Sequence, residues 1–430
     1  MQSNDTTREP NWLYSRRFFL RGGAAAAAAI AMPFEVIGAA RKAIVHQDYS
    51  PDYGPLFPTN DEATGLPLLK LPAGFRYISY GWTGDVMGDG IATPSLHDGM
   101  AVCGVDRDKL VLVRNHEQGG TSGSFTGAST TFDALADGGN TRLKFNAAKG
   151  KWLHSEAVLS GTIRNCAGGP TPWNSWLSCE ETSVGPHTVI NGQNPFTKQH
   201  GWVFDVPAWG KASAEPLLGL GAFSHEACAV DPVTGIVYET EDATPSGFFR
   251  FVPKTYGKLK RGKLQMMKLD APNNATAVID GQSWGYFNTG AGFPAGTSWN
   301  VSWVDIADPT AMFTPGGSYG GVQAQGLVQG ASSIVRGEGC WYGNGVIYVC
   351  STSGGANGNG QIFAYDPKRE TFTLVFESSG DMVLDNPDNI AWSPRGSLIL
   401  CEDGNVSPQQ LRGLTLDGAI FPFCANNLDF

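Results

Sequence analysis

The stretch Asn165 to Glu181, N-C-A-G-G-P-T-P-W-N-S-W-L-S-C-E-E, joins a glycine- and proline-rich part, an aromatic part and a pair of carboxylates. We interpret it as a turn, then a short β-strand, then a polar strand end. Polar residues that directly follow an apolar strand are a frequent place for binding sites. This stretch therefore predicts a β-rich fold with a site at a strand end.

Similar strand-turn-strand phrases recur along the chain: F-D-V-P at 204–207, F-V-P-K at 251–254, A-Y-D-P-K at 364–368 and A-W-S-P-R-G at 391–396. Their spacing of tens of residues indicates radial repetition, which favours an all-β fold of the β-propeller type. Six blades of roughly 65 residues, with loop insertions, would fit the length of the chain. A pair of β-sandwiches is the alternative architecture.

The composition agrees with many short strands and tight turns. The 430 residues include 56 glycines, 26 prolines and 12 tryptophans, and only 16% are charged. The formal net charge of −10 argues against nucleic acid as a partner, because binding to a phosphate backbone needs a basic surface.

The N-terminus has the layout of a twin-arginine export signal. S-R-R-F-F-L-R at 15–21 precedes an alanine-rich run that is too short to span a bilayer, and small residues follow at 38–40. We expect a signal peptide at 1–40, recognition by the twin-arginine export machinery, and a periplasmic or secreted protein without a stable membrane anchor after cleavage. Residues 41–65 are predicted to form an extended arm, and residues 66–430 a single propeller domain.

Polar and potentially metal-binding residues follow many of the predicted strands. Thiolates suit iron, zinc or copper(I), and carboxylates suit calcium, magnesium or manganese, so a mixed cluster is favoured over a single ion. Carboxylates that converge in one channel would repel one another unless cations neutralised them. Taken singly, each residue also fits an ordinary strand end or turn. The set comprises Asn115, His116, Glu117, Cys166, Glu180, Glu181, His225, Glu226, Glu239, Glu241, Asp242, Arg336, Glu338, Asp385, Asp388, Asn389, Glu402 and Asp403.

Several motifs in this set occur together in a known family. They are R-N-H-E at 114–117, N-C-A-G-G at 165–169, S-H-E-A at 224–227, Y-E-T-E-D at 238–242, R-G-E-G at 336–339 and P-D-N at 387–389. In these motifs and their order the chain resembles the PhoX-type alkaline phosphatases. The resemblance implies a propeller that hydrolyses phosphate monoesters of small molecules with a cluster of two ferric ions and calcium ions.

The resemblance also implies roles for individual residues. Cys166 is similar to the iron-binding thiolate, Glu226 and Glu338 to carboxylates of the cluster, and Arg336 to a cation that orients the phosphate. His116 is the second candidate catalytic residue. Further candidates for binding calcium or supporting the cluster are Glu117, Glu181, Glu241, Asp388 and Glu402.

Two other functions remain open at this point. One is a calcium-dependent propeller that hydrolyses lactones or other esters, and the other is a non-catalytic binding propeller that calcium stabilises. The chain is also shorter than the family members it resembles, and Asn174-Ser175 stands where Gly-Thr is expected. The substrate range is therefore open as well.

Overall fold

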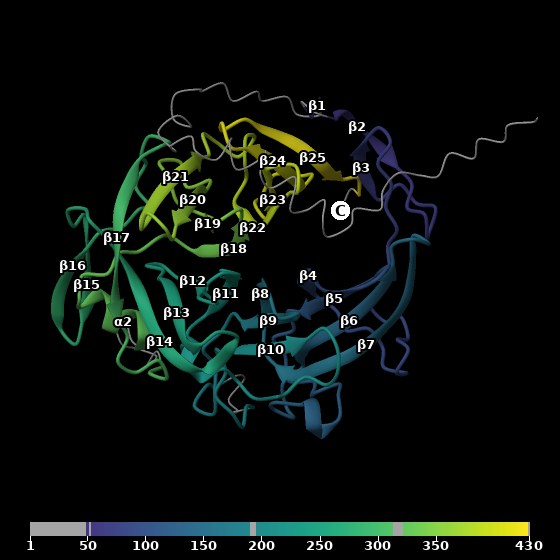
Figure 1. Ribbon diagram of the computed structural model, residues 1–430, viewed down its shortest axis with the longest axis horizontal. Helices are drawn as coiled ribbons and strands as arrows, with labels where there is room; N and C mark the ends of the chain where they lie inside the picture. The colour runs from purple at the N-terminus through teal and green to yellow at the C-terminus, as the bar shows by residue number, and fades with distance from the viewer. Residues whose placement is uncertain (1–48, 51–52, 190–194, 313–320, 429–430) are drawn as a thin grey trace, which may run out of the picture.

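The protein is a ring of β-sheets arranged around a centre, as Figure 1 shows. The computed structural model describes residues 49–50, 53–189, 195–312 and 321–428. The prediction of an all-β propeller is confirmed, and the alternative of two β-sandwiches is wrong. The predicted signal peptide at 1–40 lies outside the described residues.

The strands form antiparallel sheets that follow the chain order around the ring. The first sheet contains β4 (His97–Asp106), β5 (Lys109–His116), β6 (Gly138–Asn146) and β7 (Lys151–Thr162). The second contains β8 (Asn165–Pro170), β9 (Ser175–Glu180) and β10 (Val203–Pro207). β15 (Ala275–Ile279) and β16 (Gln282–Tyr286) form a separate hairpin.

A nine-stranded sheet makes up the next part of the ring. Its first half contains β11 (His225–Val230), β12 (Val237–Glu241), β13 (Phe248–Thr255) and β14 (Lys258–Leu269). Its second half contains β18 (Gly337–Gly343), β19 (Val346–Ser351), β20 (Gln361–Asp366) and β21 (Thr371–Glu377). β17 (Ser298–Asp305) joins the halves, and the short helix α2 (Gly321–Leu327) lies near β14 and β16.

The two ends of the chain meet in the last sheet. β22 (Pro387–Trp392), β23 (Ser397–Glu402), β24 (Gln410–Thr415) and β25 (Ile420–Asn426) continue into β3 (Leu69–Pro72), β2 (Gly54–Thr59) and β1 (Tyr49–Ser50). Because N-terminal strands complete a C-terminal sheet, the first and last segments are tied together. The described part of the predicted arm at 41–65 thus contributes strands to this sheet.

Five strands lie innermost, each at an edge of a sheet: β4, β8, β11, β18 and β22. From β4 to β22, each contacts the next one in this order. The described strands therefore form five radial units around the centre, and they do not establish the sixth blade of the prediction. In the described residues no helix has the length and apolar character needed to cross a membrane.

The glycine-rich part of the opening stretch was predicted to be a turn, and this is wrong. It forms the inner strand β8, and the turn comes later, at 171–174. A Cβ atom on Gly168 would lie 1.9 Å from the carbonyl oxygen of Leu177, and one on Gly169 would lie 1.9 Å from that of Cys228. Glycine is present because neighbouring backbones approach too closely for a side chain.

The hydrophobic core fills the space between the sheets. Fully buried side chains such as Leu177, Val203, Phe249 and Phe251 pack β9 and β10 against β13. Tyr238, Phe363 and Phe372 belong to a second cluster, which joins the two halves of the nine-stranded sheet. This packing holds the inner strands rigidly, and so it holds the site that they carry.

Candidate metal centre

Every inner strand begins with the same irregularity. The first residue of the inner strand pairs with the last residue of the following strand. Before the next pair, the inner strand advances by three residues and its neighbour by two, so the inner strand has one extra residue, which is a β-bulge. The pairs on the two sides of the bulge are His97↔His116 and Met100↔Arg114, Asn165↔Glu180 and Gly168↔Ser178, His225↔Glu241 and Cys228↔Glu239, Gly337↔Ser351 and Cys340↔Val349, and Pro387↔Glu402 and Ile390↔Leu400.

The bulge determines which side chains face the centre, because an extra residue re-aims its side chain out of the regular alternation. The second residue of each inner strand lies in the bulge, and we call these the inner positions: Asp98, Cys166, Glu226, Glu338 and Asp388. The residue directly after each second strand lies beside them, and we call these the rim positions: Glu117, Glu181, Asp242, Thr352 and Asp403.

Seven of these residues form a continuous centre of potential ligands. Three overlapping groups each have their ligand atoms within 4.8 Å of one another: Asp98, Glu117 and Cys166; Cys166, Glu181 and Glu226; and Glu226, Glu338 and Asp388. Cys166 and Glu226 each belong to two groups. We call the seven residues the acidic centre, and six of them were predicted from the sequence.

Three predicted site residues lie elsewhere. His116, Glu241 and Glu402 are the last residues of β5, β12 and β23, directly before the rim positions. Because side chains alternate along a strand, these three point away from the acidic centre. Their partners are protein groups: His116 Nδ1 lies 3.0 Å from the Ser95 carbonyl oxygen, Glu241 accepts from the amide of Gly247, and Glu402 accepts from Arg412.

None of the three ligand groups found among the described residues includes His116, Glu241 or Glu402. The rim positions next to Glu241 and Glu402 are occupied by Asp242 and Asp403. His116 is fully buried, and its Nε2 lies 2.9 Å from the Thr141 hydroxyl. Burial and the nearby Arg114 lower the pKa of His116 to about 3. Its ring therefore fixes the end of β5 and the position of Glu117.

The carboxylates of the acidic centre destabilise one another's charge. Burial raises the pKa of Asp98 to about 8, and the carboxylates of Asp388 and Glu117 add to the shift. Burial likewise raises the pKa of Glu181 to about 8, although Arg164 opposes the shift. The pKa values of Glu226 and Glu338 lie well above the usual range because both are buried beside other acids. Bound cations would remove this cost.

Glu226 provides the clearest test of whether metal ions fit here. It is 1% exposed, and neither carboxylate oxygen has a hydrogen-bond partner within the part of the chain that the structure describes. A buried carboxylate is normally hydrogen-bonded, paired with a charge or bound to a metal. Since the neighbours of Glu226 are a thiol and further carboxylates, the donor set is suited to cations and fits a metal cluster.

Two arginines at equivalent places border the acidic centre. Arg164 and Arg336 each directly precede an inner strand and have left-handed backbone conformations, with φ values of 48° and 45°. Arg164 lies 2.7 Å from Glu181 and 3.3 Å from Glu117. Non-glycine residues rarely adopt this conformation, and strained positions of this kind cluster at functional sites.

Arg336 makes a two-point contact with the rim. Its Nε and Nη2 atoms each donate to a different oxygen of Asp242 at 2.9 Å, and Nη2 also donates to Glu338 at 2.8 Å. Among the residues that the structure describes, Nη1 has no hydrogen-bond partner. The guanidinium can therefore offer a donor to an anion above the acidic centre.

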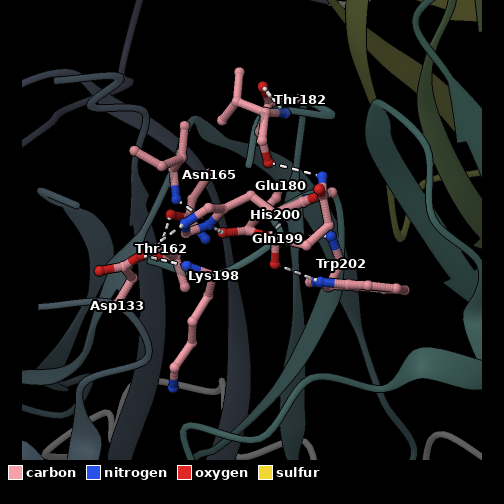
Figure 2. Close-up of polar contacts among 12 residues, drawn as sticks. Asp133, Thr162, Asn165, Glu180, Thr182, Lys198, Gln199, His200 and Trp202 are labelled. Atoms are coloured by element: carbon pink, nitrogen blue, oxygen red, sulfur yellow. Dashed lines mark hydrogen bonds and ion pairs between the residues drawn. The ribbon is translucent and has the colours of Figure 1, made fainter. Parts of the chain in front are cut away.

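A buried polar network is formed by residues next to Glu181 and Cys166 in the sequence, and Figure 2 shows its members Glu180, His200 and Asp133. Glu180 is fully buried, and its oxygens accept from the amides of Ile163, Gly201 and Trp202. His200 lies between two acids, with Nδ1 at 2.7 Å from Glu180 and Nε2 at 3.7 Å from Asp133. The network joins the turn before β8 to the end of β9, and thus fixes the two strand ends.

This network predicts a measurable dependence of stability on pH. Burial lowers the pKa of His200, but Glu180 and Asp133 outweigh burial and leave it above the usual 6.5. A raised folded-state pKa means that the stabilisation is fully present below pH 6.5 and is lost as pH rises through the folded value. We expect His200→Ala to lower the free energy of unfolding by about 3 kcal/mol at pH 6.

Urea unfolding at a series of pH values checks this expectation. The difference in stability between the wild type and His200→Ala should shrink as pH rises from 6 to 9. A difference that stays constant with pH would show that His200 is neutral in the folded protein. Exposed His187 offers a matched control, since its replacement by alanine should leave the pH profile unchanged.

Sequence reasoning did not select Asp98 or Arg164, and it listed Asp242 and Asp403 without assigning them roles. A local signal existed for Asp98. The inner positions are followed by small residues in Asp98-Gly99, Cys166-Ala167, Glu226-Ala227 and Glu338-Gly339. A search for an acid or a cysteine that is followed by a small residue at the start of an apolar strand would have selected Asp98.

Comparisons with known proteins indicate the family and the fold of the chain. A family model described as alkaline phosphatase PhoX matches residues 51–158 and 153–428. The structure of PhoX from Pseudomonas fluorescens, in complex with the transition-state analogue vanadate, is similar with a TM-score of 0.59 and 16% identity, over 87% of this chain and 89% of that chain. At this identity the likeness concerns the fold.

A candidate 6-phosphogluconolactonase from Bacteroides uniformis matches less well, with a TM-score of 0.33 and 13% identity over 77% of this chain and 84% of that chain. No curated protein sequence matches the chain.

Proposed function

The chain belongs to the PhoX alkaline phosphatase family, and from this premise we propose that it hydrolyses phosphate monoesters at the acidic centre. The observation that carries the proposal is the set of three overlapping ligand groups. Two of them contain Glu226, whose two buried oxygens have no hydrogen-bond partner among the described residues. The oxygens of buried Glu180, in contrast, accept hydrogen bonds from the amides of Ile163, Gly201 and Trp202. A carboxylate left free among other acids is suited to cations.

We propose that the acidic centre holds iron and calcium. Cys166 supplies the thiolate, which favours iron, and Glu226 and Glu338 are the carboxylates at the inner positions of the next two inner strands. Asp98, Glu117, Glu181 and Asp388 provide the oxygen ligands that calcium prefers. When bound, such ions polarise phosphoryl oxygens and activate water.

The chain's own cations would hold the phosphoryl group. Arg336 is anchored by Asp242 and Glu338, so its guanidinium is oriented before an anion arrives. Arg164 occupies the equivalent position two inner strands earlier and is half exposed. Oriented donors of this kind stabilise the negative charge that gathers on the phosphoryl oxygens during transfer.

Other residues of the site act through position. His116 fixes the strand that ends at Glu117, and the His200 network fixes Glu181 and the start of β8. We assign neither histidine a proton-transfer step, because the ring nitrogens of His116 already have protein partners and His200 is fully buried. These hydrogen-bonded histidines hold the carboxylates of the acidic centre close together although their like charges repel one another.

Export through the twin-arginine pathway is part of the proposal. S-R-R-F-F-L-R at 15–21 and the alanine-rich run after it support this interpretation. The pathway carries folded proteins, so that metal ions could be loaded before transit. The substrates would then be small phosphate esters that are present outside the cytoplasm.

Metal removal tests the proposed function directly. Protein prepared through its own export route should contain iron and calcium and should hydrolyse p-nitrophenyl phosphate at alkaline pH. Chelation should reduce this rate by about a hundredfold or more, because the oriented charges of the site are then missing. Hydrolysis of a lactone without hydrolysis of the phosphate ester would favour a lactonase, and calcium without iron or activity would favour a binding propeller.

A further inference from the structure

The ring has two faces of different character. The acidic centre lies where the inner strands begin, so the turns that follow these strands lie on the opposite face, which we call the distal face. The turns after β4, β8 and β11 and the turn between β13 and β14 all lie there. The loop after β10 joins them, since the Ala208 amide donates to the Asn174 carbonyl oxygen.

Exposed apolar side chains gather on the distal face of three consecutive sheet units. Val105 is 60% exposed, Trp209 44%, Val233 79% and Tyr256 48%. The Tyr256 hydroxyl donates to the Pro232 carbonyl oxygen at 3.0 Å, so these two turns touch. Single exposed apolar residues are ordinary on protein surfaces. Four at the tips of neighbouring turns on one face form a patch, which indicates a partner.

A basic groove lies beside these tips. The cavity has a volume of about 650 Å³, and residues 205–217 and the β13–β14 hairpin form its walls. Five cations and two acids line it: Lys211, Lys254, Lys258, Lys260, Arg261, Asp205 and Glu215. Glu215 pairs with Lys260. Within the part of the chain that the structure describes, the other four cations form no ion pair with a carboxylate.

The groove is unusual for this chain as a whole. The net charge is −10, and the acidic centre concentrates carboxylates on the other face. Unpaired cations at close range repel one another, and an anionic partner relieves this repulsion. The basic groove therefore lies next to the apolar tips, on the face opposite the acidic centre.

We propose that the distal face binds the surface of an anionic lipid bilayer. The rings of Trp209 and Tyr256 enter the headgroup region, where amphipathic aromatic side chains are favoured. The groove cations contact the lipid phosphates. A soluble polyanion would explain the cations but would give no role to the exposed apolar tips. Binding is peripheral and reversible, and it leaves the acidic centre facing away from the membrane.

Vesicle sedimentation with the full chain tests this inference, and the result does not depend on phosphatase activity. The protein should bind vesicles of phosphatidylglycerol and phosphatidylcholine in equal parts, should not bind pure phosphatidylcholine, and should dissociate as salt rises. The double variant Lys254→Glu/Arg261→Glu should bind at least about tenfold more weakly. Trp209→Ser/Tyr256→Ser should also weaken binding by about tenfold, because apolar area is lost from the contact.

A matched control separates the groove from net charge. Arg76→Glu/Arg395→Glu changes the charge by the same amount on exposed residues that do not line the groove, one after β3 and one in the turn between β22 and β23. It should bind like the wild type, and the activity of every variant should be unchanged. Wild-type binding by the groove variant overturns the inference. Binding of inorganic polyphosphate without binding of vesicles also overturns it, and assigns the groove to a soluble polyanion.

Discussion

Glu226→Gln is expected to abolish phosphatase activity, by about a thousandfold or more, while making the metal-free protein more stable. Glu226 belongs to two of the three ligand groups, and both of its oxygens are buried and lack a hydrogen-bond partner among the residues that the structure describes. An amide of the same shape cannot supply the negative charge that would hold cations there. It also removes an acid whose pKa is raised by burial and by Glu338 and Asp388. A raised pKa of an acid in the folded state costs stability at neutral pH, so the metal-free fold should gain about 1 kcal/mol.

The measurements are kcat/KM for p-nitrophenyl phosphate, bound metal per chain, and urea unfolding of the metal-free protein. Glu241→Gln is the matched control, since Glu241 is equally buried but accepts hydrogen bonds from Gly247 and Gln323. The control should keep its metal and most of its activity. If Glu226→Gln remained active and Glu241→Gln did not, the sequence-based assignment of Glu241 would be right and the acidic centre would not be the active site.

Cys166→Ser is expected to remove iron from the protein and to reduce activity by a hundredfold or more. Cys166 is the thiol shared by two ligand groups. Burial and the nearby carboxylates of Glu226, Asp98 and Asp388 raise the pKa of this thiol well above its usual range. A bound cation is therefore what makes it a thiolate, because metal binding displaces the proton. Serine does not replace a thiolate as an iron ligand.

Visible absorption spectra and metal analysis of purified protein check this expectation. The wild type should show a thiolate-to-iron charge-transfer band that the variant lacks, and calcium should be retained in part. Cys103→Ala is the control, because Cys103 is also buried but lies outside the ligand groups. An unchanged spectrum in Cys166→Ser would show that Cys166 is not a metal ligand. It would leave the proposed role of the carboxylates unaffected.

The sequence predicted most members of the acidic centre because acids and a cysteine at strand ends form a recognisable pattern. It placed Glu241 and Glu402 at the centre although their neighbours Asp242 and Asp403 occupy the rim. Adjacent residues in a strand face opposite sides, so an error of one position reverses the direction of the side chain. The sequence text alone does not say at which residue a strand stops.

The glycine-rich part of the opening stretch was misread for a related reason. Glycine and proline usually mark turns, but Gly168 and Gly169 lie in an inner strand whose neighbours leave no space for a Cβ atom. That crowding arises between different strands, Leu177 on one side and Cys228 on the other. Local sequence rules contain no information about such neighbours.

The sequence by itself determined that the chain forms many short strands with tight turns. It also determined that acidic residues follow many of these strands. These properties follow from local preferences and from alternation along each strand. Only the tertiary structure decided that five inner strands begin with the same β-bulge and so direct Asp98, Cys166, Glu226, Glu338 and Asp388 toward one place. A bulge depends on how two strands pair, and pairing is fixed by contacts between residues on different strands.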